Sequence, residues 1–586
     1  MGTVTRFGIP LLLIGLSAHS PATTIRSISI HGNTVFTARE IAGWLSSRAG
    51  SALSEPALQG DLRQVLDEYR TLGYLGVRAH FARLQFTSDS ASADLTLELK
   101  EGRQTVVGTV RIRGPLRLTE AEILEQFDLR SGAPYNDAVL EQDIQVLLVR
   151  YEKLGYPFAR CSVESLDRRP GPGVDSAAID LHVEEGDLMH IDEIRVEGNK
   201  ETDADVVVRE TRIVPGETYN PTKISAIRQR LNRLNIFSSV AEPELYTRAG
   251  KGGLLVKVQE GSTNTFDGIV GYIPVAASGG GGYLTGLASV AMRNLFGTGR
   301  KLSLHWQRED RYSQEIGIQY LEPWVFGAPV NIGGGWLQHQ QDTSYVRRTL
   351  DLRTELMFSE ELSVALLFNT VRVIPATDSL TGPRVIGTNE VTAGLEIQYD
   401  SRDDIYSPES GARYRTDYHY GHKTITDVPT YAQGLIAGGG TVQRVSVDFE
   451  FFIPAFRRQV IAIGLHGREV HTSEVQESEM YRFGGASTLR GYREDQFLGS
   501  EVAWTNAEYR FLLARRTYFF IFLDTGYYNH PGDDLRGIPS SQAFRYGYGI
   551  GIRLDTALGN LAVSFALGEG DSFSTAKIHF GLINDF

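Results

Sequence analysis

Residues 544–554 read FRYGYGIGIRL, with aromatic and aliphatic side chains at even positions and arginine or glycine at odd ones. Successive side chains of a β-strand point to opposite faces, so this stretch predicts a strand with one apolar and one polar face. Residues 445–452, VSVDFEFF, alternate in the same way. An apolar outer face and a polar inner face are typical of a transmembrane β-barrel.

Sixteen segments of this kind follow one another after about residue 263. Their approximate spans are 263–275, 283–294, 300–309, 312–321, 329–339, 344–358, 361–374, 388–400, 410–421, 438–452, 458–470, 501–513, 517–527, 543–554, 559–568 and 575–586. The even count, short turns after most even-numbered segments and a long loop at about 471–500 predict an all-β 16-stranded barrel over 263–586. A soluble β-sandwich or propeller would also alternate, but an apolar N-terminal stretch and a final aromatic residue favour the barrel.

The last segment ends in Phe586 and has Gly581 five residues before it. This pattern resembles the C-terminal signal by which outer-membrane proteins are recognised for assembly. Asn584 stands where that signal usually has an aromatic residue, so the resemblance is partial.

The first half contains one unit three times. Residues 28–33 (ISIHGN) recur as 110–114 (VRIRG) and 194–199 (IRVEGN), with the glycines 82 and 84 residues apart. Each opening strand ends at glycine, which suits a turn with positive φ. A helical stretch starts near a threonine cap in each copy: Thr37, Thr119 and Thr202.

The middle and end of the unit also recur. The end of a helix reads YRTLGY at 69–74 and YEKLGY at 151–156, and the third copy has RLNIF at 233–237. An alternating strand and an acidic Glu-Gly turn close each copy, at 97–102, 181–186 and 255–261. Each unit is thus predicted to be β-α-α-β-β.

These units resemble the POTRA module, the polypeptide-transport-associated domain. We expect POTRA repeats at 23–102, 103–186 and 187–262. The resemblance implies that the sheet edge and its groove hold extended peptides by β-augmentation, although three α+β modules would also serve as a plain spacer.

Composition argues against several functions. The formal charge is −13 and basic residues are scattered, so nucleic acid is not an expected partner. Cys161 is the only cysteine and is interpreted as a small apolar side chain. No Cys/His cluster has metal-ligand spacing, and the GxSxG, HExxH and GxxxxGK[ST] motifs are absent, so neither a cofactor nor enzyme activity is expected. The glycine run 279–282 is interpreted as a flexible outer loop.

The N-terminus predicts secretion. Arg6 precedes a short apolar stretch at 9–16, and small residues would allow cleavage before Thr23. We therefore expect a signal peptide at 1–22, with a buried first helix as the alternative.

Several barrel segments resemble the BamA/TamA superfamily of outer-membrane assembly factors. They are NLFGTGR at 294–300 and EPWVFG at 322–327, similar to the family's first and second periplasmic turns, and YDSRD at 399–403, similar to its mid-barrel turn. A metal site at the aspartates of the third segment is the alternative, but charged turn residues explain them more simply. With the repeats, the resemblance covers nearly the whole mature chain.

The most specific match is FGG at 483–485 followed by Leu489, Arg490, Gly491 and Tyr492. In the family this loop folds into the lumen and its arginine meets acidic residues on nearby strands. The matching positions are Glu508 and Asp524. A guanidinium away from bulk water requires a carboxylate partner; the alternative is a solvated Arg490.

The resemblance implies a TamA-like factor that binds unfolded β-barrel or autotransporter segments and helps them insert. It implies outer-membrane lipid and an inner-membrane TamB-like protein as further candidate partners. A lateral seam is expected between 263–275 and 575–586. Its residues are Gly268, Gly271, Pro274, Gly581 and Phe586, because glycine and proline weaken a strand and a chain end can fray.

Three alternatives remain open. A reduced BamA-type factor would serve general clients, and a two-partner secretion transporter would export a protein through the lumen. A passive porin or adhesin belongs to another class of protein. The three repeats match TamA best, and they have no evident purpose in a porin.

Overall fold

A computed structural model of the chain describes residues 23–586 except 89–90, 115–116, 274–282, 309, 379–381, 384, 406, 430–433, 435–437, 515, 534–536, 557–558 and 584–586. The expected signal peptide, the glycine run 279–282, Pro274, Asn584 and Phe586 lie outside these residues. The chain divides into two compact units. One comprises the chain through residue 190 with residues 217–221, and the other comprises 191–216 with 222–586.

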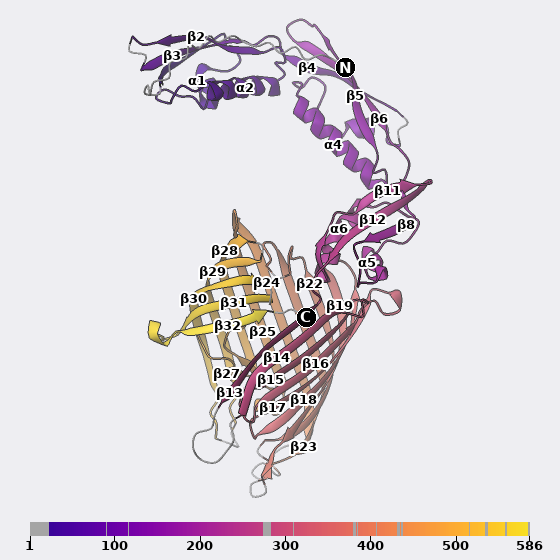
Figure 1. Cartoon of the computed structure of the whole chain (residues 1–586), viewed down its shortest axis with the longest axis vertical. Coiled ribbons are helices and arrows are strands. Elements are labelled where there is room, and N and C mark those ends of the chain that lie inside the picture. The colour runs from indigo at the N-terminus through magenta and orange to yellow at the C-terminus, as the bar shows by residue number, and fades with distance from the viewer. Residues whose placement is uncertain are drawn as a thin grey trace. The chain divides into compact units, whose positions relative to one another are not determined.

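The first unit holds two copies of the predicted β-α-α-β-β module (Figure 1). The first copy consists of β1 (Thr24–His31), α1 (Ala38–Trp44), α2 (Glu55–Thr71), β2 (Arg78–Phe86) and β3 (Ser92–Lys100). The second consists of β4 (Thr105–Arg113), α3 (Glu120–Leu124), α4 (Asp137–Lys153), β5 (Arg160–Arg169) and β6 (Asp175–Glu184). In each sheet the first strand pairs in parallel with the last, giving the orders β1-β3-β2 and β4-β6-β5.

The third copy has the same plan with additional short strands. It consists of β7 (His190–Ile191), β8 (Glu193–Glu197), α5 (Ala204–Thr211), β9 (Glu217–Thr218), α6 (Pro221–Arg233), β10 (Phe237–Val240), β11 (Glu244–Arg248) and β12 (Lys251–Glu260). β12 pairs with β8, β10 and β11.

The repeated glycines mark a backbone collision that only glycine avoids. Gly32, Gly114 and Gly198 all have positive φ. An added Cβ would collide with the carbonyl oxygen of the adjacent strand, at Leu99 in the first copy and Val183 in the second. The sequence repeat is therefore a repeat of one packed turn.

The acidic turns bind the loop that follows the first strand. In the first copy the Glu101 carboxylate accepts from the backbone N–H groups of Thr34 and Val35, at 2.7 and 2.9 Å, and from the Tyr69 hydroxyl. Burial alone would raise the pKa of Glu101, but these donors hold it below its ordinary value. In the third copy Glu260 accepts from the Thr202 N–H at 2.7 Å.

The expected helix caps are confirmed in two copies and corrected in the third. Thr37 and Thr119 cap α1 and α3, each in a capping box with the glutamate three residues on. In the third copy Asp203, not Thr202, is the N-cap residue. Thr202 is displaced from this role because Glu260 binds its N–H and its hydroxyl accepts from another part of the chain.

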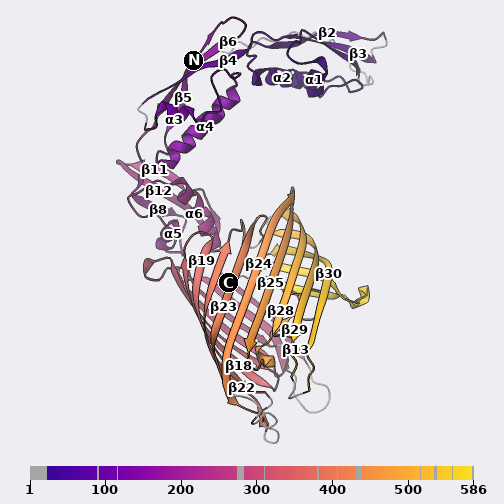
Figure 2. The same ribbon diagram turned by 180° about the vertical axis from the view of Figure 1, so that it is seen from behind.

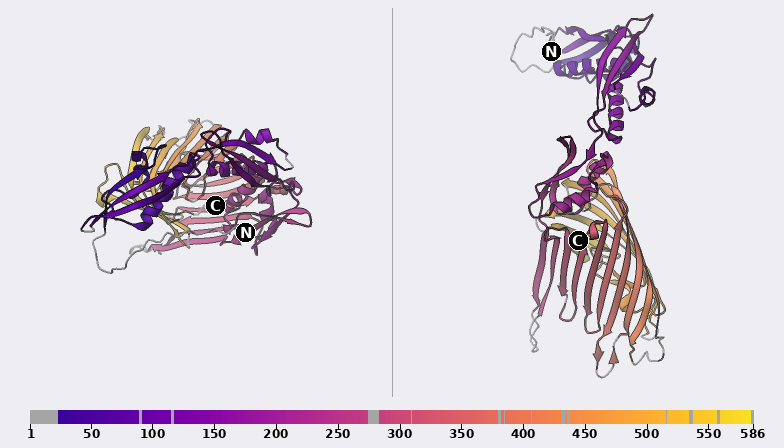
Figure 3. Two further views of the ribbon diagram at one scale, coloured as in Figure 1. Left: turned by 90° about the horizontal axis from the view of Figure 1, so that it is seen from above. Right: turned by 90° about the vertical axis from the view of Figure 1, so that its right-hand side faces the viewer.

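All sixteen predicted strands are present and form one antiparallel sheet, in which each strand pairs with the next (Figures 1 and 2). They are β13 (Asn264–Ile273), β14 (Tyr283–Leu295), β15 (Arg300–Arg308), β16 (Gln314–Glu322), β17 (Val330–Gln341), β18 (Tyr345–Met357), β19 (Leu362–Pro375), β22 (Gly387–Asp400), β23 (Gly411–Asp427), β24 (Gly439–Phe456), β25 (Gln459–Thr472), β28 (Glu501–Ala514), β29 (Thr517–His530), β30 (Ser541–Thr556), β31 (Gly559–Gly568) and β32 (Lys577–Ile583). The strands form a continuous curved wall (Figure 3). None of the helices in the described part of the chain is long and apolar enough to cross a membrane.

Side-chain exposure gives the two faces of this wall. On β29, Ile521 and Leu523 are exposed, whereas Phe520, Phe522 and Asp524 are buried. The apolar exposed positions form the outer face, as the alternation predicted, and Asp524 lies on the inner face.

Candidate functional site

The long loop between β25 and β28 returns to the inner face of the barrel. It contains β26 (Tyr481–Phe483) and β27 (Phe497–Gly499), which pair with each other. Phe483, Leu489 and Tyr492 are buried together with Val502 of β28. This apolar contact holds the loop against the strands that follow it.

Arg490 makes the central polar contact of the loop. Its Nε and Nη2 donate to the two carboxylate oxygens of Asp524, both at 2.7 Å, and its Nη1 donates to Glu508 at 2.7 Å. The Phe522 ring lies 3.7 Å from the guanidinium carbon. Arg490 is 6% exposed and Asp524 is fully buried. The structure thus brings together the three residues that the sequence comparison had grouped.

The next two residues join the loop to the last strands of the barrel. Gly491 has a φ of 95°, and a Cβ there would lie 2.7 Å from the backbone of Gly568 on β31. The Tyr492 hydroxyl donates to the Tyr546 carbonyl of β30 and accepts from the N–H of Glu569, both at 3.0 Å. Each residue of the motif therefore has its own contact.

His579 on β32 is a contact that the sequence reasoning missed. Its Nε2 accepts from the Gly491 N–H at 3.1 Å, and its side chain is buried. The loop thereby reaches the strand at the end of the sheet. In the sequence, the only feature that pointed to His579 was its position among the inward-facing residues of its strand. Many polar residues share this feature.

The start of the loop has a second attachment, also missed. The Lys423 ammonium binds the Glu479 carboxylate at 3.0 Å, and both side chains are almost fully buried. Arg444 donates to the Glu479 carbonyl at 3.1 Å, and Arg347 donates to the Ser478 carbonyl at 3.0 Å. These cations come from β18, β23 and β24. The loop is therefore held by the middle strands at its start and by the last strands at its motif.

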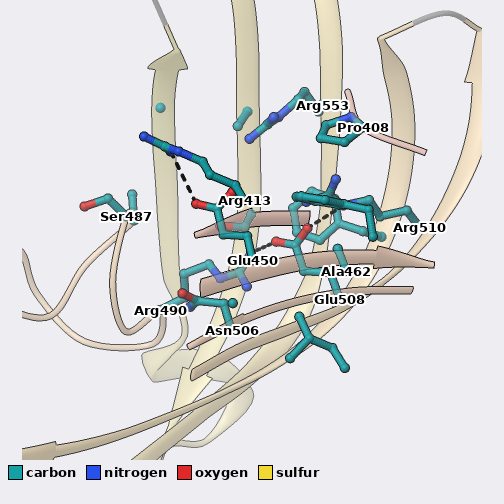
Figure 4. A pocket seen from close by; sticks show the side chains of 18 of the residues that line it. Pro408, Arg413, Glu450, Ala462, Ser487, Arg490, Asn506, Glu508, Arg510 and Arg553 are labelled. Atoms are coloured by element: carbon teal, nitrogen blue, oxygen red, sulfur yellow. Dashed lines mark hydrogen bonds and ion pairs between the residues drawn. The ribbon is translucent and has the colours of Figure 1, made fainter. Parts of the chain in front are cut away.

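A cavity of about 520 Å³ lies beside the motif on the inner face. Its charged wall, shown in Figure 4, includes Arg413, Arg510 and Arg553 with the carboxylates of Glu450 and Glu508. Glu508 binds Arg510 at 2.9 Å as well as Arg490. No group of three or more His, Cys, Asp or Glu suited to a metal ion occurs among the described residues.

The strand at each end of the sheet has one strand partner among the described residues, whereas each interior strand has two. β13 pairs with β14, where Gly268 faces Ala288 and Gly271 faces Thr285. β32 pairs with β31, where Gly581 faces Ala562. Between residues 264–273 and 577–583 no strand pairing is found.

The third repeat contacts three turns of the barrel, in the same compact unit. In the turn between β14 and β15, the Gly297 carbonyl accepts from the Asp203 N–H at 2.9 Å. In the turn between β16 and β17, the Trp324 indole donates to Glu210 at 2.7 Å. Burial raises the pKa of Glu210, and the indole N–H opposes this shift.

A cluster of ion pairs joins the third repeat to the turn between β18 and β19. Arg230 of α6 is buried and binds Glu360 of this turn at 2.5 Å, and Arg212 binds the same carboxylate at 3.2 Å. Arg230 also donates to the Glu210 and Thr211 carbonyls that end α5. The turns that contact the third repeat all lie at one end of the barrel strands.

Comparisons with known proteins agree with this architecture. The model of the Omp85 superfamily domain matches residues 294–586, and the POTRA model, described as a surface antigen variable number repeat, matches 23–102, 105–186 and 189–261. The chain is 25% identical over 324 residues to the outer membrane protein assembly factor BamA of Neisseria meningitidis, covering 53% of this chain and 39% of that protein. It is 23% identical over 604 residues to BamA of Nitratidesulfovibrio vulgaris, covering 83% and 73%.

The chain thus spans about two-fifths of the first relative's length and nearly three-quarters of the second's. The crystal structure of BamA from Haemophilus ducreyi lacking POTRA domains 1–3 matches with a TM-score of 0.50 and 17% identity, over 81% of this chain and 98% of that one. This structural likeness concerns the fold alone.

Proposed function

Because the chain belongs to the Omp85 superfamily, we propose that it is an outer-membrane assembly factor that binds unfolded β-barrel or autotransporter segments and assists their insertion. The observation that carries the proposal is the asymmetry of the sheet ends. The luminal loop binds β32, whereas β13 has only β14 as a partner among the described strands. Such an end offers unpaired backbone groups to an incoming strand.

Clients first meet the periplasmic repeats. The orders β1-β3-β2 and β4-β6-β5 leave β2 and β5 at sheet edges. Both edge strands carry exposed apolar side chains, Leu84 and Phe86 on β2 and Val163 and Leu166 on β5. An extended apolar segment can add to such an edge through backbone hydrogen bonds.

Insertion then uses the lateral seam between β13 and β32. Gly268, Gly271 and Gly581 reduce side-chain packing there, and Pro274 and Phe586 extend the proposed seam beyond the described residues. The free energy comes from the client, since its unpaired edges become paired and its apolar surface enters lipid. No catalytic chemistry is part of this proposal.

Locking the seam tests the proposal. In a Cys161→Ser background, single cysteines at 264–268 are combined with single cysteines at 578–581, and the pair that forms a disulfide is used. We expect reconstituted vesicles with the locked protein to lose insertion of an unfolded barrel client and to regain it on reduction. The matched control carries Gly268→Cys and Ala288→Cys. These positions pair between β13 and β14, so their disulfide leaves the seam free.

The outcome also separates the alternatives. Unchanged client insertion by the locked protein would contradict the seam as the working site. A second outcome would favour a passive pore or a secretion transporter. In that case the unlocked protein inserts no client, and solute flux through the pore is the same with and without the lock.

We further propose that the protein has a TamA-like role, with an inner-membrane TamB-like protein as its partner. The three repeats support it. Photo-crosslinking from exposed positions of the first repeat in cells should yield one large inner-membrane protein. Crosslinks to periplasmic lipoproteins alone would favour the reduced BamA-type role.

A further inference from the structure

The cavity beside the loop motif has more arginines than carboxylates on its wall. Two carboxylates, those of Glu450 and Glu508, line this space of about 520 Å³. Five arginines line it as well: Arg402, Arg413, Arg490, Arg510 and Arg553 (Figure 4). A pocket lined mostly by one sign of charge concentrates ions of the opposite sign. The wall therefore attracts anions unless each arginine is already satisfied.

Two of the five arginines are satisfied by carboxylates that do not line the cavity. Arg402 donates to both oxygens of Asp400, at 2.9 and 2.8 Å. Arg490 donates to both oxygens of Asp524 at 2.7 Å. A bidentate pair of this kind matches the geometry of a guanidinium closely. Arg402 and Arg490 therefore belong to the framework of the wall, and we do not expect them to bind a further anion.

Arg413 of β23 is held much less tightly. Its side chain is 29% exposed, and its ion pair with Glu450 has a separation of 3.6 Å. A charge-assisted hydrogen bond is shorter, at roughly 2.7–2.9 Å. The Nε of Arg413 has no hydrogen-bond partner among the described residues. Glu450 is also 3.8 Å from Arg402, so this carboxylate is shared. Arg413 thus keeps donors for a ligand in the cavity.

Arg510 adds positive charge behind the wall. Its Nε binds Glu508 at 2.9 Å, whereas its Nη1 is buried without a hydrogen-bond partner among the described residues. The Tyr518 ring lies 4.8 Å from its guanidinium carbon. Glu508 binds Arg490 as well, at 2.7 Å. One carboxylate therefore serves two arginines, and the partly compensated charge of Arg510 acts over a short distance in a site of low dielectric constant.

Small residues keep the space between these side chains open. The inner positions of β25 and β31 include Ala462 and Ala562, and β32 contributes Gly581. A Cβ added at Gly581 would meet only the Cβ of Ala562, at 3.9 Å. Arg553 of β30 reaches the same space from a strand far from β23 in the sheet order. The cavity thus lies between guanidinium groups of separate strands.

We propose that this cavity binds a small oxyanion of the phosphate class, held by Arg413 and Arg553 and stabilised by the charge of Arg510. The planar guanidinium matches the oxygens of phosphate, and a tetrahedral anion can accept from two guanidiniums that belong to different strands. Glu450 has the same sign as the ligand and limits its affinity. The bound anion links β23 to β30 across the inner face. This inference concerns the lumen and is independent of client insertion.

Equilibrium dialysis with radiolabelled inorganic phosphate tests the proposal. The full chain is folded in a non-ionic detergent, and ionic strength is held constant with sodium chloride. We expect saturable binding at one site, with displacement of the label by sulfate and much weaker displacement by added chloride. Binding that does not saturate would overturn the proposal. Displacement by chloride as effective as by sulfate would show only ionic screening and would also overturn it.

The arginine variants locate the site. Arg413→Gln and Arg553→Gln should each weaken phosphate binding about tenfold, the typical effect of losing a hydrogen bond to a charged group. The matched control is Arg415→Gln. Arg415 lies on the same face of β23 but pairs with Glu396 at 2.8 Å, and it does not line the cavity. Heat-modifiable migration checks the folding of each variant. An equal loss of affinity in the control would place the anion elsewhere and overturn the proposal.

Glu450→Gln guards against variants that merely disturb the barrel. Removal of this like charge should tighten phosphate binding several-fold, which a loss of folded structure cannot produce. Unchanged or weaker binding would contradict the site.

Short-chain phosphatidylglycerol separates the two sources of phosphate. When it is added to the protein in detergent, it should leave the labelled phosphate bound, because the cavity lies on the inner face of the barrel. Displacement by this lipid would assign the site to a lipid headgroup and overturn the proposal.

Discussion

The two ends of the barrel sheet are supported very differently. β32 is bound by β31 and, through His579, by the luminal loop, and the loop motif also contacts β28 to β31. β13 is bound by β14. For the proposed seam, we therefore expect the C-terminal side to be a fixed wall and the β13–β14 hairpin to be the side that moves.

Removal of the loop arginine Arg490 should cause the largest loss of barrel stability. Arg490→Ala leaves the buried Asp524 and Glu508 without their common partner. A buried pair broken on one side costs about 3–5 kcal/mol, and two carboxylates place this variant at the upper end. Urea titration of the folded barrel should show the loss, and client insertion should fall strongly.

The matched control is Arg493→Ala, an exposed charge in the same loop, with an expected cost of about 0–1 kcal/mol. If Arg490→Ala, Asp524→Ala and Glu508→Ala all behave as wild type, the loop motif does not stabilise the C-terminal side of the sheet.

Lys423→Ala should be the second largest change, at about 3 kcal/mol, because it leaves Glu479 buried without its cation. The start of the loop should then loosen while the motif stays in place. Proteolysis near residues 474–480 should accelerate, with the Arg490 contact preserved. His422→Ala, on the exposed face of the same strand, is the control. Equal cleavage rates in both variants would show that this attachment does not hold the loop.

His579→Ala tests the link to the last strand directly. Loss of the hydrogen bond to Gly491 costs about 0.5–1.5 kcal/mol, and the contact of His579 with Glu494 at 3.8 Å is lost with it. Hydrogen exchange should increase along 577–583 and stay unchanged in the β13–β14 hairpin. An increase of the same size in both would mean that the two ends are not independently supported.

Gly268→Val should have the smallest effect, and with the opposite sign. A Cβ at Gly268 meets only ordinary contacts, with the Leu287 carbonyl oxygen at 3.5 Å and the Phe266 ring at 3.7 Å. A β-branched residue favours the strand by up to about 1 kcal/mol. Hydrogen exchange in β13 should slow slightly, and client insertion should slow with it. Faster insertion would argue that β13 is not the moving side.

The sequence by itself was sufficient for the architecture. Alternation with a period of two is a local property, so all sixteen strands could be assigned from residues a few positions apart. The three repeats could be recognised because the same packed turn, with Gly32 and Glu101 as its first example, recurs at a fixed spacing. The group of Arg490, Glu508 and Asp524 could be proposed because its motif resembles that of a known family.

Only the tertiary structure decided which distant charged and polar groups meet. The Lys423–Glu479 pair, the Gly491–His579 contact and the Arg230–Glu360 cluster join residues from 56 to 130 positions apart. Most inward positions of such a barrel are polar, so no periodicity distinguishes a residue that binds the loop from one that faces water. The partner of each charge follows from strand register and loop path, which are set by the pairing of strands along the whole sheet.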